Sequence, residues 1–321
     1  MGYTRYVDIY DPEMIMKLIG QKWQYDAKVV QFGSVRVDSL PLQGTQLTEI
    51  RQTRFQGRSG QALNAGDPIS AVGHVQTTSK HPILWRYDRS LEPDVTTEIE
   101  EKNVPKINAD LSTDIQNAAS QYVDDSFVST IKGTGAALSD NQYGTGSTTI
   151  SLDELAIAQG KLGDQANKLA GGIVFGNSAV YTKLYRLGLV AATSNTFGNA
   201  AQDQMVKAGM LPSQVLGMTY VMNDKFAAVS ANKYYLYMIA PQSMVMRGSG
   251  SPLIEAHRVI DTPATSTYFS VKFSAGFDGV SWGGTASEKV SDSDLETSGN
   301  WTLSASYSKY IKLVRFYTTT A

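Results

Sequence analysis

The sequence predicts an α+β fold in which one long helix supports several β-rich segments. Apolar residues recur every three and four positions between Leu111 and Ile131, a spacing typical of an amphipathic helix. Residues 41–85 contain two polar, extended stretches separated by turn-forming residues, which indicates a hairpin. From residue 215 onward the chain consists mostly of strand-like segments, and the last of them, within 300–316, ends five residues before the C-terminus. We expect this final strand to complete a sheet with distant parts of the chain.

The N-terminal 85 residues predict two extended limbs. Residues 1–40 have scattered apolar positions and indicate an arm with one short helix at Pro12–Ile19. Residues 48–58 and 70–85 are the expected strands of the hairpin, and SGQALNAGDP lies between them. A two-stranded hairpin that is polar on both faces is marginal alone in water. We therefore expect it to lie against its own body or against a neighbouring chain.

The long helix is expected to include Asn108–Ile131 without a break. Pro105 suits its first turn, and Gly133 suits its end. At about 1.5 Å per residue such a helix spans roughly 40 Å, so it would act as a strut across the molecule. Asp124 and Asp125 are adjacent, so they point to different sides of the helix, and we expect both carboxylates to be solvated.

Residues 151–188 predict a second helix, a buried strand and a third helix. Ser151 and Glu154 match a capping box, in which each side chain bonds the backbone N–H of the other residue. A glycine-bounded strand, GGIVFG, occupies residues 171–176. Asn177 or Ser178 would cap the helix that follows, and Gly188 would end it. The inward side of the second helix is expected to carry Leu155, Leu162, Ala166 and Leu169.

The C-terminal part predicts a mixed β region. Its strands are expected in VLGMTYVMND, KYYLYMIA, SMVMRG, LIEAHRVI and TYFSVKFSAGF. We expect residues 268–277 and 305–316 to share one closing sheet, with 283–299 connecting them. Asp292, Asp294 and Glu296 alternate in this connection, but the glycine and the distal glutamate of a calcium-binding loop are missing. A solvated acidic loop is therefore expected.

Composition and motifs argue against catalysis. The chain has 321 residues, no cysteine and three histidines, so thiolate chemistry and disulfides are excluded. The histidines show no metal-ligand spacing, no nucleophile motif is present, and the glycine-rich loop after the long helix lacks the phosphate-binding spacing. We predict no catalytic, cofactor or metal site. A net charge of −2 disfavours specific nucleic-acid binding, and no apolar run reaches the roughly 20 residues of a membrane span.

The order of these elements resembles the major capsid protein family of tailed bacteriophages, the Hong Kong phage fold, which encapsulin shells share. ASQYVDDSFVSTIKGTGAA resembles the end of the family's spine helix and its following loop. SLDELAIAQGKLGDQANKLAGGIVFGNSAVYTKLYRL resembles the second helix and the start of the axial domain. LGMTYVMND and WTLSASYSKYIKLVRF resemble two of its strands, although Thr219 stands where the family usually has proline.

This resemblance implies a structural protein that self-assembles into pentamers and hexamers of an icosahedral shell around double-stranded DNA. It implies a location in the virion capsid after assembly in the host cytoplasm, loose contact with packaged DNA, no membrane partner, and possible scaffolding, cement and portal proteins. It also implies five regions: an N-terminal arm at 1–40, an extended hairpin loop at 41–88, a peripheral domain at 89–170 and 260–321, and an axial domain at 171–259.

If the hairpin lies on an adjacent subunit, its basic residues should pair with an acidic segment there, and these pairs would set register more than affinity. Three alternatives stay open: an encapsulin-type compartment, a hydrolase with a β-rich domain, and another virion part such as a tail-tube subunit. The expected intersubunit residues are Arg51, Arg54, Arg58 and Lys80 on the hairpin, and Glu98, Glu100 and Glu101 on the neighbour.

Overall fold

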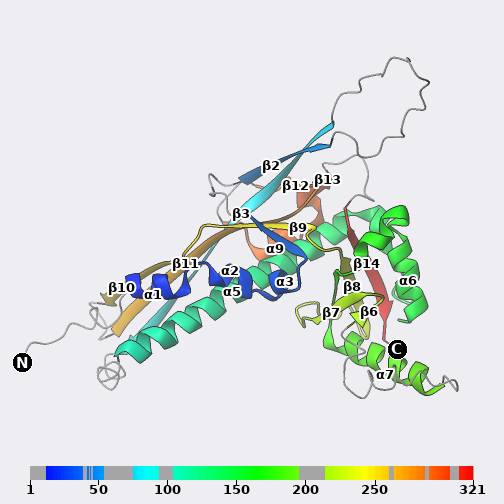
Figure 1. Cartoon of the computed structure of the whole chain (residues 1–321), viewed down its shortest axis with the longest axis horizontal. Coiled ribbons are helices and arrows are strands. Elements are labelled where there is room, and N and C mark those ends of the chain that lie inside the picture. Colours follow the sequence, from blue (N-terminus) through cyan, green and yellow to red (C-terminus); the bar gives the residue numbers. More distant parts are fainter. Residues whose placement is uncertain are drawn as a thin grey trace, which may run out of the picture.

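Two six-stranded sheets are joined by one long helix in the computed structural model of the chain (Figure 1). The structure describes residues 12–38, 42, 44, 46–53, 75–93, 104–194, 214–259, 264–285, 289–303 and 311–320. The long helix, α5, lies beneath the first sheet and runs on toward the second. None of the described helices is both long and apolar enough to cross a membrane.

The first sheet is built on two long strands. β3 and β11 pair antiparallel from Ile83↔Ser274 to Pro93↔Ala264, and β9 and β10 pair with the other edge of β11. Phe269, Val271 and Phe273 of β11 are buried in the main core, as expected for the covered face of a strand. The strands are β1 (Val35–Asp38), β2 (Gln46–Thr53), β3 (Val75–Pro93), β9 (Met244–Gly248), β10 (Leu253–Val259) and β11 (Ala264–Phe277).

Helix α5 covers this buried face and is longer than predicted. It extends from Val104 to Ala137, so the prediction of an unbroken Asn108–Ile131 helix is confirmed, but the predicted end at Gly133 is wrong. Gly133 and Gly135 permit close packing instead of ending the helix. A Cβ on Gly133 would lie 1.9 Å from the backbone oxygen of Leu295, and one on Gly135 would lie 2.7 Å from the ring of Tyr237.

The N-terminal segment packs on its own chain. The helix predicted at Pro12–Ile19 is confirmed as α1, and Lys22–Asp26 and Lys28–Gln31 form α2 and α3. Ile15, Ile19 and Trp23 are fully buried in the core that α5 also enters, so the predicted extension of this limb is wrong for residues 12–38. Its apolar positions are spaced to cover α5. Residues 1–11 lie outside the described part.

The two aspartates on α5 are engaged with other segments. Asp124 accepts hydrogen bonds from the backbone N–H groups of Lys28 and Val29, and its burial raises the pKa of its carboxyl above the ordinary value. Asp125 forms an ion pair with Lys225. The expectation that both carboxylates are solvated is therefore wrong, because neighbouring elements cover these turns of α5.

The second sheet contains the C-terminal strand, as predicted from its position, but with different partners. β14 pairs with β8 on one edge and β4 on the other, so the prediction that residues 268–277 and 305–316 share a sheet is wrong. β11 already has partners on both edges, while β14 is buried on both faces and belongs inside a sheet. The strands are β4 (Gln142–Tyr143), β5 (Ile173–Gly176), β6 (Gln214–Val215), β7 (Met218–Met222), β8 (Lys233–Ile239) and β14 (Leu313–Thr319).

Helices cover both faces of this second sheet. One face joins the core of α5, and the other packs on α6 (Leu152–Gly160), the 3₁₀ helix η4 (Gly163–Leu169) and α7 (Ser178–Ser194). Ser151 caps α6 as predicted, but Glu154 accepts a hydrogen bond from Tyr143 instead of completing the box. Asn177 caps α7 by accepting from the N–H of Ala179, and the predicted end of α7 at Gly188 is wrong.

Candidate functional site: the base of the hairpin

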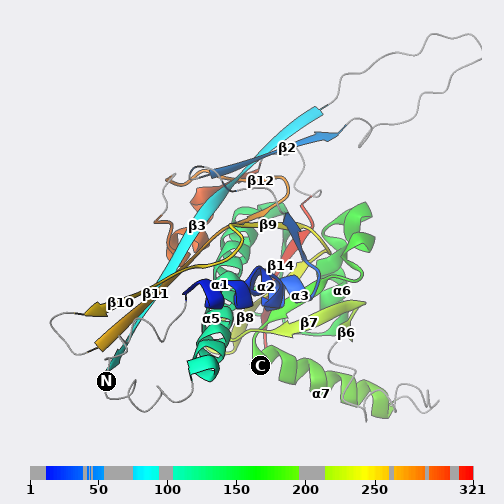
Figure 2. The ribbon, with the colours of Figure 1, turned by 60° about the vertical axis from the view of Figure 1, so that its left-hand side comes forward.

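The predicted hairpin is present and projects from the body (Figure 2). β2 and β3 pair antiparallel from Gln46↔Pro82 to Thr53↔Val75, and residues 54–74 lie outside the described part. The described pairing ends at Pro82, which has no N–H to continue a ladder. Beyond that point β3 is paired with β11 and belongs to the body. Residues 81–84, where the hairpin becomes body, are all buried.

His81 lies buried at this junction, and we call it the pivot. Its side chain is fully buried, and its Nε2 lies 3.1 Å from the backbone oxygen of Phe277, so Nε2 donates and carries the proton. Its Nδ1 makes no hydrogen bond to any described residue. The ring leaves no room for a side chain at Gly276, where a Cβ would lie 2.2 Å from the ring carbon Cδ2. Burial lowers the pKa of His81 to about 4.

Serine hydroxyls tie the lower end of the hairpin to the turn after β11. Ser79 Oγ accepts a hydrogen bond from the N–H of Gly279 at 3.1 Å. Ser281 Oγ accepts from the N–H of Lys80 at 3.1 Å and donates to the oxygen of Thr78 at 3.3 Å. Ser281 belongs to β12 (Val280–Trp282), which pairs with β13 (Trp301–Leu303). The hairpin is thus fixed where it leaves the sheet.

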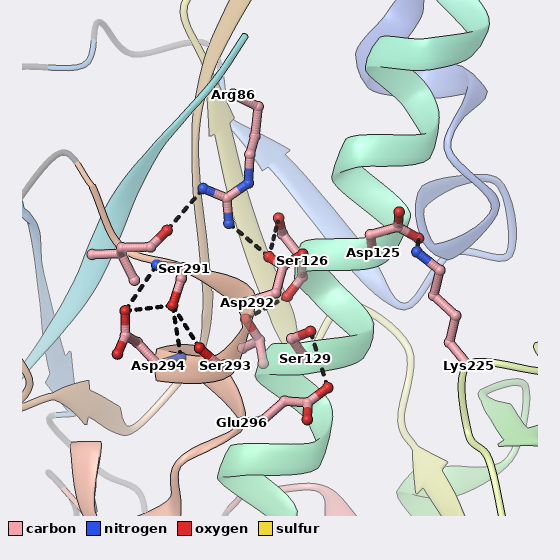
Figure 3. A network of polar contacts seen from close by, with 12 residues as sticks. Arg86, Asp125, Ser126, Ser129, Lys225, Ser291, Asp292, Ser293, Asp294 and Glu296 are labelled. Carbon is pink, nitrogen blue, oxygen red and sulfur yellow. Dashed lines mark hydrogen bonds and ion pairs between the residues drawn. The ribbon is translucent and has the colours of Figure 1, made fainter. Parts of the chain in front are cut away.

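Two charged residues of β3 just beyond the pivot, the half-buried Arg86 and the exposed Asp88, bond to neighbouring elements. Asp88 accepts a hydrogen bond from the hydroxyl of Tyr122 on α5 at 2.7 Å, and burial with this bond raises the pKa of Tyr122 to about 12. Arg86 donates to the backbone oxygen of Val290 at 2.8 Å and to Asp292 Oδ1 at 2.6 Å (Figure 3). The strand that carries the hairpin is therefore joined to α5 directly and to the segment around Asp292.

That segment forms a short capped helix. α9 extends from Asp292 to Glu296, and Ser291 and Asp294 form a complete capping box at its start. The prediction of a solvated acidic loop is wrong here, because the carboxylates are used as acceptors. Asp292 accepts from Arg86 and from Ser126 of α5 (Figure 3). Glu296 accepts from Lys132 of α5 at 2.9 Å.

The predicted intersubunit residues fall mostly outside the described part. Arg54, Arg58, Glu98, Glu100 and Glu101 lie there, and of Arg51 only the backbone is described, opposite Thr77 in the hairpin. Lys80 is exposed beside the pivot. Every expected pair includes at least one residue outside the described part, so the structure does not test these pairs and they stay a prediction.

Sequence reasoning missed the residues that join the hairpin strand to the body. Arg86 lies inside a strand-like stretch, and nothing in its immediate sequence indicates that its partner lies more than 200 positions away. The capping box did have a signal, because Ser291 followed three residues later by Asp294 is a helix-start pattern. That pattern would have predicted α9 in place of a loop.

Two grooves formed by described residues have no Asp, Glu or His side chain in their lining. One groove of about 720 Å³ lies beside β3 and is lined by Trp85, Arg86, Tyr87, Tyr268 and residues 289–291. Over the described residues, no group of three or more His, Asp or Glu side chains is placed to hold a metal ion. What the geometry provides is a projecting limb with a firmly seated base.

Comparison with known proteins identifies the family. Residues 90–311, well over half of the chain, match the family described as Major capsid protein 13-like, or Gp13-like. The chain belongs to this major capsid protein family. It is a head shell protein of a tailed phage, and the prediction of a structural, non-enzymatic protein is confirmed by the family. The encapsulin alternative is not favoured. No curated protein matches the chain significantly.

Solved phage heads show the same fold. The capsid of Ralstonia phage GP4 has a TM-score of 0.57 at 8% identity, with 90% of this chain and 87% of that chain covered. The capsid of cyanophage P-SCSP1u has 0.55 at 11% identity, covering 92% and 89%. The head structure of Helicobacter pylori bacteriophage KHP40 has 0.52 at 8% identity, covering 90% and 89%. The predicted Hong Kong phage capsid fold is thereby confirmed.

Proposed function

We propose that this major capsid protein forms the pentamers and hexamers of a closed icosahedral head around double-stranded DNA, and that the hairpin of each subunit lies on an adjacent copy. The observation that carries the proposal is the hairpin itself. The backbone of its described part pairs between the two strands, its base is tied to the body by the serine contacts and His81, and it leads away from the body (Figure 2). A polar two-stranded limb gains stability when another surface covers it.

The chemistry of the subunit supports contacts of this kind. Specific interfaces bury roughly 1,200–2,000 Å² in total, and a projecting limb adds such area without requiring a rigid self-complementary face. Several weak contacts act together once a ring or shell closes. Arg51, Arg54, Arg58 and Lys80 would then pair with Glu98, Glu100 and Glu101 of the next copy and fix its register.

The division of the chain into regions is part of the proposal. A peripheral domain at 89–170 and 260–321 would combine α5 with β11 and the end of β3 in the first sheet, and an axial domain within 171–259 would be centred on α7 and the strands β5 to β8. Of the peripheral range, α6, β4 and β14 pack in or on the second sheet. The strands β9 and β10 of the axial range lie in the first sheet. The hairpin loop at 41–88 would link neighbouring subunits. Scaffolding, cement and portal proteins are further proposed partners, and assembly would take place in the host cytoplasm.

A truncated hairpin tests the proposal. Leu47 and His81 face each other in the register, so residues 48–80 can be replaced by Asn-Gly, a pair that suits a two-residue hairpin turn. The pivot and everything beyond it stay intact. We expect a folded subunit, with the helical content of the body unchanged by circular dichroism, that no longer forms closed particles in electron micrographs.

The control keeps the hairpin and removes only its charge. Arg51→Gln with Arg54→Gln and Arg58→Gln should still form particles, with a modest rise in the protein concentration needed for assembly, because exposed ion pairs contribute only about 0–1 kcal/mol each. Closed particles of normal size and yield from the truncated subunit would refute the role of the hairpin.

A further inference from the structure

We propose that Arg86 is a positioning residue for shell assembly, because it fixes the direction in which the hairpin leaves the body. It acts through the clasp, which we define as residues 289–301 with α9 at their centre. The inference rests on the proposed function, in which the hairpin must reach a defined place on a neighbouring copy.

The first step of the argument is the shape of the Arg86 contact. One nitrogen of its guanidinium donates to the backbone oxygen of Val290 at 2.8 Å, and another donates to Asp292 Oδ1 at 2.6 Å. The Arg86 side chain is only 18% exposed. A planar fork that bonds two acceptors on one segment fixes orientation as well as distance, and a lysine ammonium is a point charge that lacks this geometry.

The second step is the rigidity of the clasp on α5. Trp301 Nε1 donates to the oxygen of Leu295 at 2.7 Å, and the same oxygen lies where a Cβ of Gly133 would be, 1.9 Å away. Ser129 of α5 donates to Glu296, and Ser126 donates to Asp292 (Figure 3). Lys132 of α5 also donates to Glu296. The acceptor that holds Arg86 is therefore itself seated on α5.

The third step is the position of Arg86 along β3. It lies four residues beyond Pro82, where the pairing with β2 ends, and β3 continues through this point as one strand from Val75 to Pro93. At about 3.3 Å per residue, Val75 is roughly 36 Å from Arg86, so a tilt of about 10° at Arg86 would move that end of the strand by about 6 Å. A shift of this size would move the hairpin away from its contact on the neighbouring copy.

The contact with the clasp also differs from the contact that Asp88 of β3 makes with α5. Asp88 bonds Tyr122 of α5 through one hydrogen bond, which sets a distance but leaves rotation free. Arg86 supplies the second point of attachment, on a separate element. Added to the ladder with β11, these two attachments on different elements set the angle between the hairpin strand and α5.

The experiment compares variants of the two attachment points. Arg86→Lys keeps the charge and loses the fork, Arg86→Met loses both, and Asp292→Asn keeps an acceptor oxygen for the guanidinium. Asp125→Asn is the matched control, because it breaks an ion pair on another side of α5, with Lys225 (Figure 3). Hydrogen exchange of α5 and β3, the distance distribution between spin labels on the hairpin and on α5, and particle size in electron micrographs are measured.

We expect Arg86→Lys and Arg86→Met to keep the exchange protection of α5 within about twofold. Both should raise the exchange rate in residues 83–93 of β3 about tenfold, because at least one charge-assisted hydrogen bond is lost. The distribution of distances between the spin labels should broaden, and the particles should become heterogeneous in size or stay open. Asp292→Asn should leave both the label distances and the particle size close to those of the unaltered protein, because it keeps an acceptor for Arg86, and Asp125→Asn should change neither.

Two results would overturn the inference. Uniform particles of normal size from Arg86→Met, while the truncated hairpin abolishes assembly, would leave the proposed function intact and remove the role of Arg86. Loss of α5 protection in both Arg86 variants would make Arg86 a stability residue without a positioning role. Normal particles from the truncated hairpin would instead refute the proposed function itself.

Discussion

The two halves of β3 show what one strand can do in two settings. Residues 83–93 pair with β11 and turn Leu84, Arg86 and Asp88 toward the core and α5. Residues 75–82 pair with β2 and are held to the body only near the pivot, by the contacts of Ser79, Lys80 and His81 that the structure describes. The first half belongs to the core of the subunit, and the second is a limb carried by it.

The difference teaches that local strand propensity does not decide where stability resides. Both halves are extended and hydrogen-bonded, but the first carries Ile83 and Leu84, whose side chains are fully buried, and burial of apolar surface is the dominant favourable contribution to folding. The limb half is polar from Gln76 to Lys80, so a covering surface would add stability that the two strands lack alone. A capsid protein can use such a limb because assembly supplies that surface.

The largest effect should separate the two halves directly. Leu84→Ala, in the core half, removes a fully buried side chain, and we expect the free energy of unfolding to fall by about 2–5 kcal/mol. Lys80→Ala, in the limb half, truncates an exposed side chain and should change it by less than about 0.5 kcal/mol. Denaturant unfolding of unassembled subunits measures both. Equal effects would mean that the limb is part of the core after all.

A smaller effect should come from the pivot between the halves, as a dependence on pH. The pKa of His81 is about 4 in the folded protein and 6.5 in the unfolded chain. Between these two pH values the unfolded chain therefore binds one more proton than the folded protein does. The contribution of His81 to the free energy of unfolding is therefore fully present above pH 6.5 and decreases as the pH is lowered from 6.5 to 4. Below pH 4, about 3 kcal/mol of the free energy of unfolding has been lost. Asp278, Arg36 and Arg247 are the charged groups that act on this ring.

Comparison with a variant isolates this contribution from that of the carboxylates. His81→Gln keeps a donor for the oxygen of Phe277 and cannot titrate, so the difference in unfolding free energy between the two proteins should shrink as the pH falls from 7 to 4. His257 is exposed and serves as the histidine control through His257→Gln. A difference that stays constant over this range would contradict the buried neutral ring.

The sequence predicted those elements whose signal is local and strongly periodic. The Asn108–Ile131 helix, the hairpin and the α1 helix each have an apolar period or turn residues within the segment itself, and all three are present. Glycines misled because their local and tertiary uses look alike. Gly133 has the sequence context of a helix end, but its lack of a side chain serves contact with Leu295, which lies 162 positions away.

The site was less predictable because its partners are distant. The pairing of β14 with β8, and of Arg86 with Asp292, depends on which sheet edges and acceptors are available after folding. Burial on both faces of β14 shows why it lies inside the second sheet, yet the sequence shows only a run of strand-forming residues. Family resemblance supplied the fold, whereas these contacts required the three-dimensional structure.

The smallest effect should test how tightly the support of the core half is packed. Gly133→Ala puts a methyl group where the oxygen of Leu295 now lies, so the clasp must shift, and we expect a loss of about 1–3 kcal/mol in spite of the better helix propensity of alanine. Gly160→Ala on α6 is the matched control, because its Cβ would meet nothing within 4 Å and should add up to about 1 kcal/mol. Thermal unfolding of both variants shows whether each substitution lowers or raises the free energy of unfolding. If Gly133→Ala were as stabilising as Gly160→Ala, the clasp would be loose, and Arg86 would have no fixed acceptor through which to orient the limb.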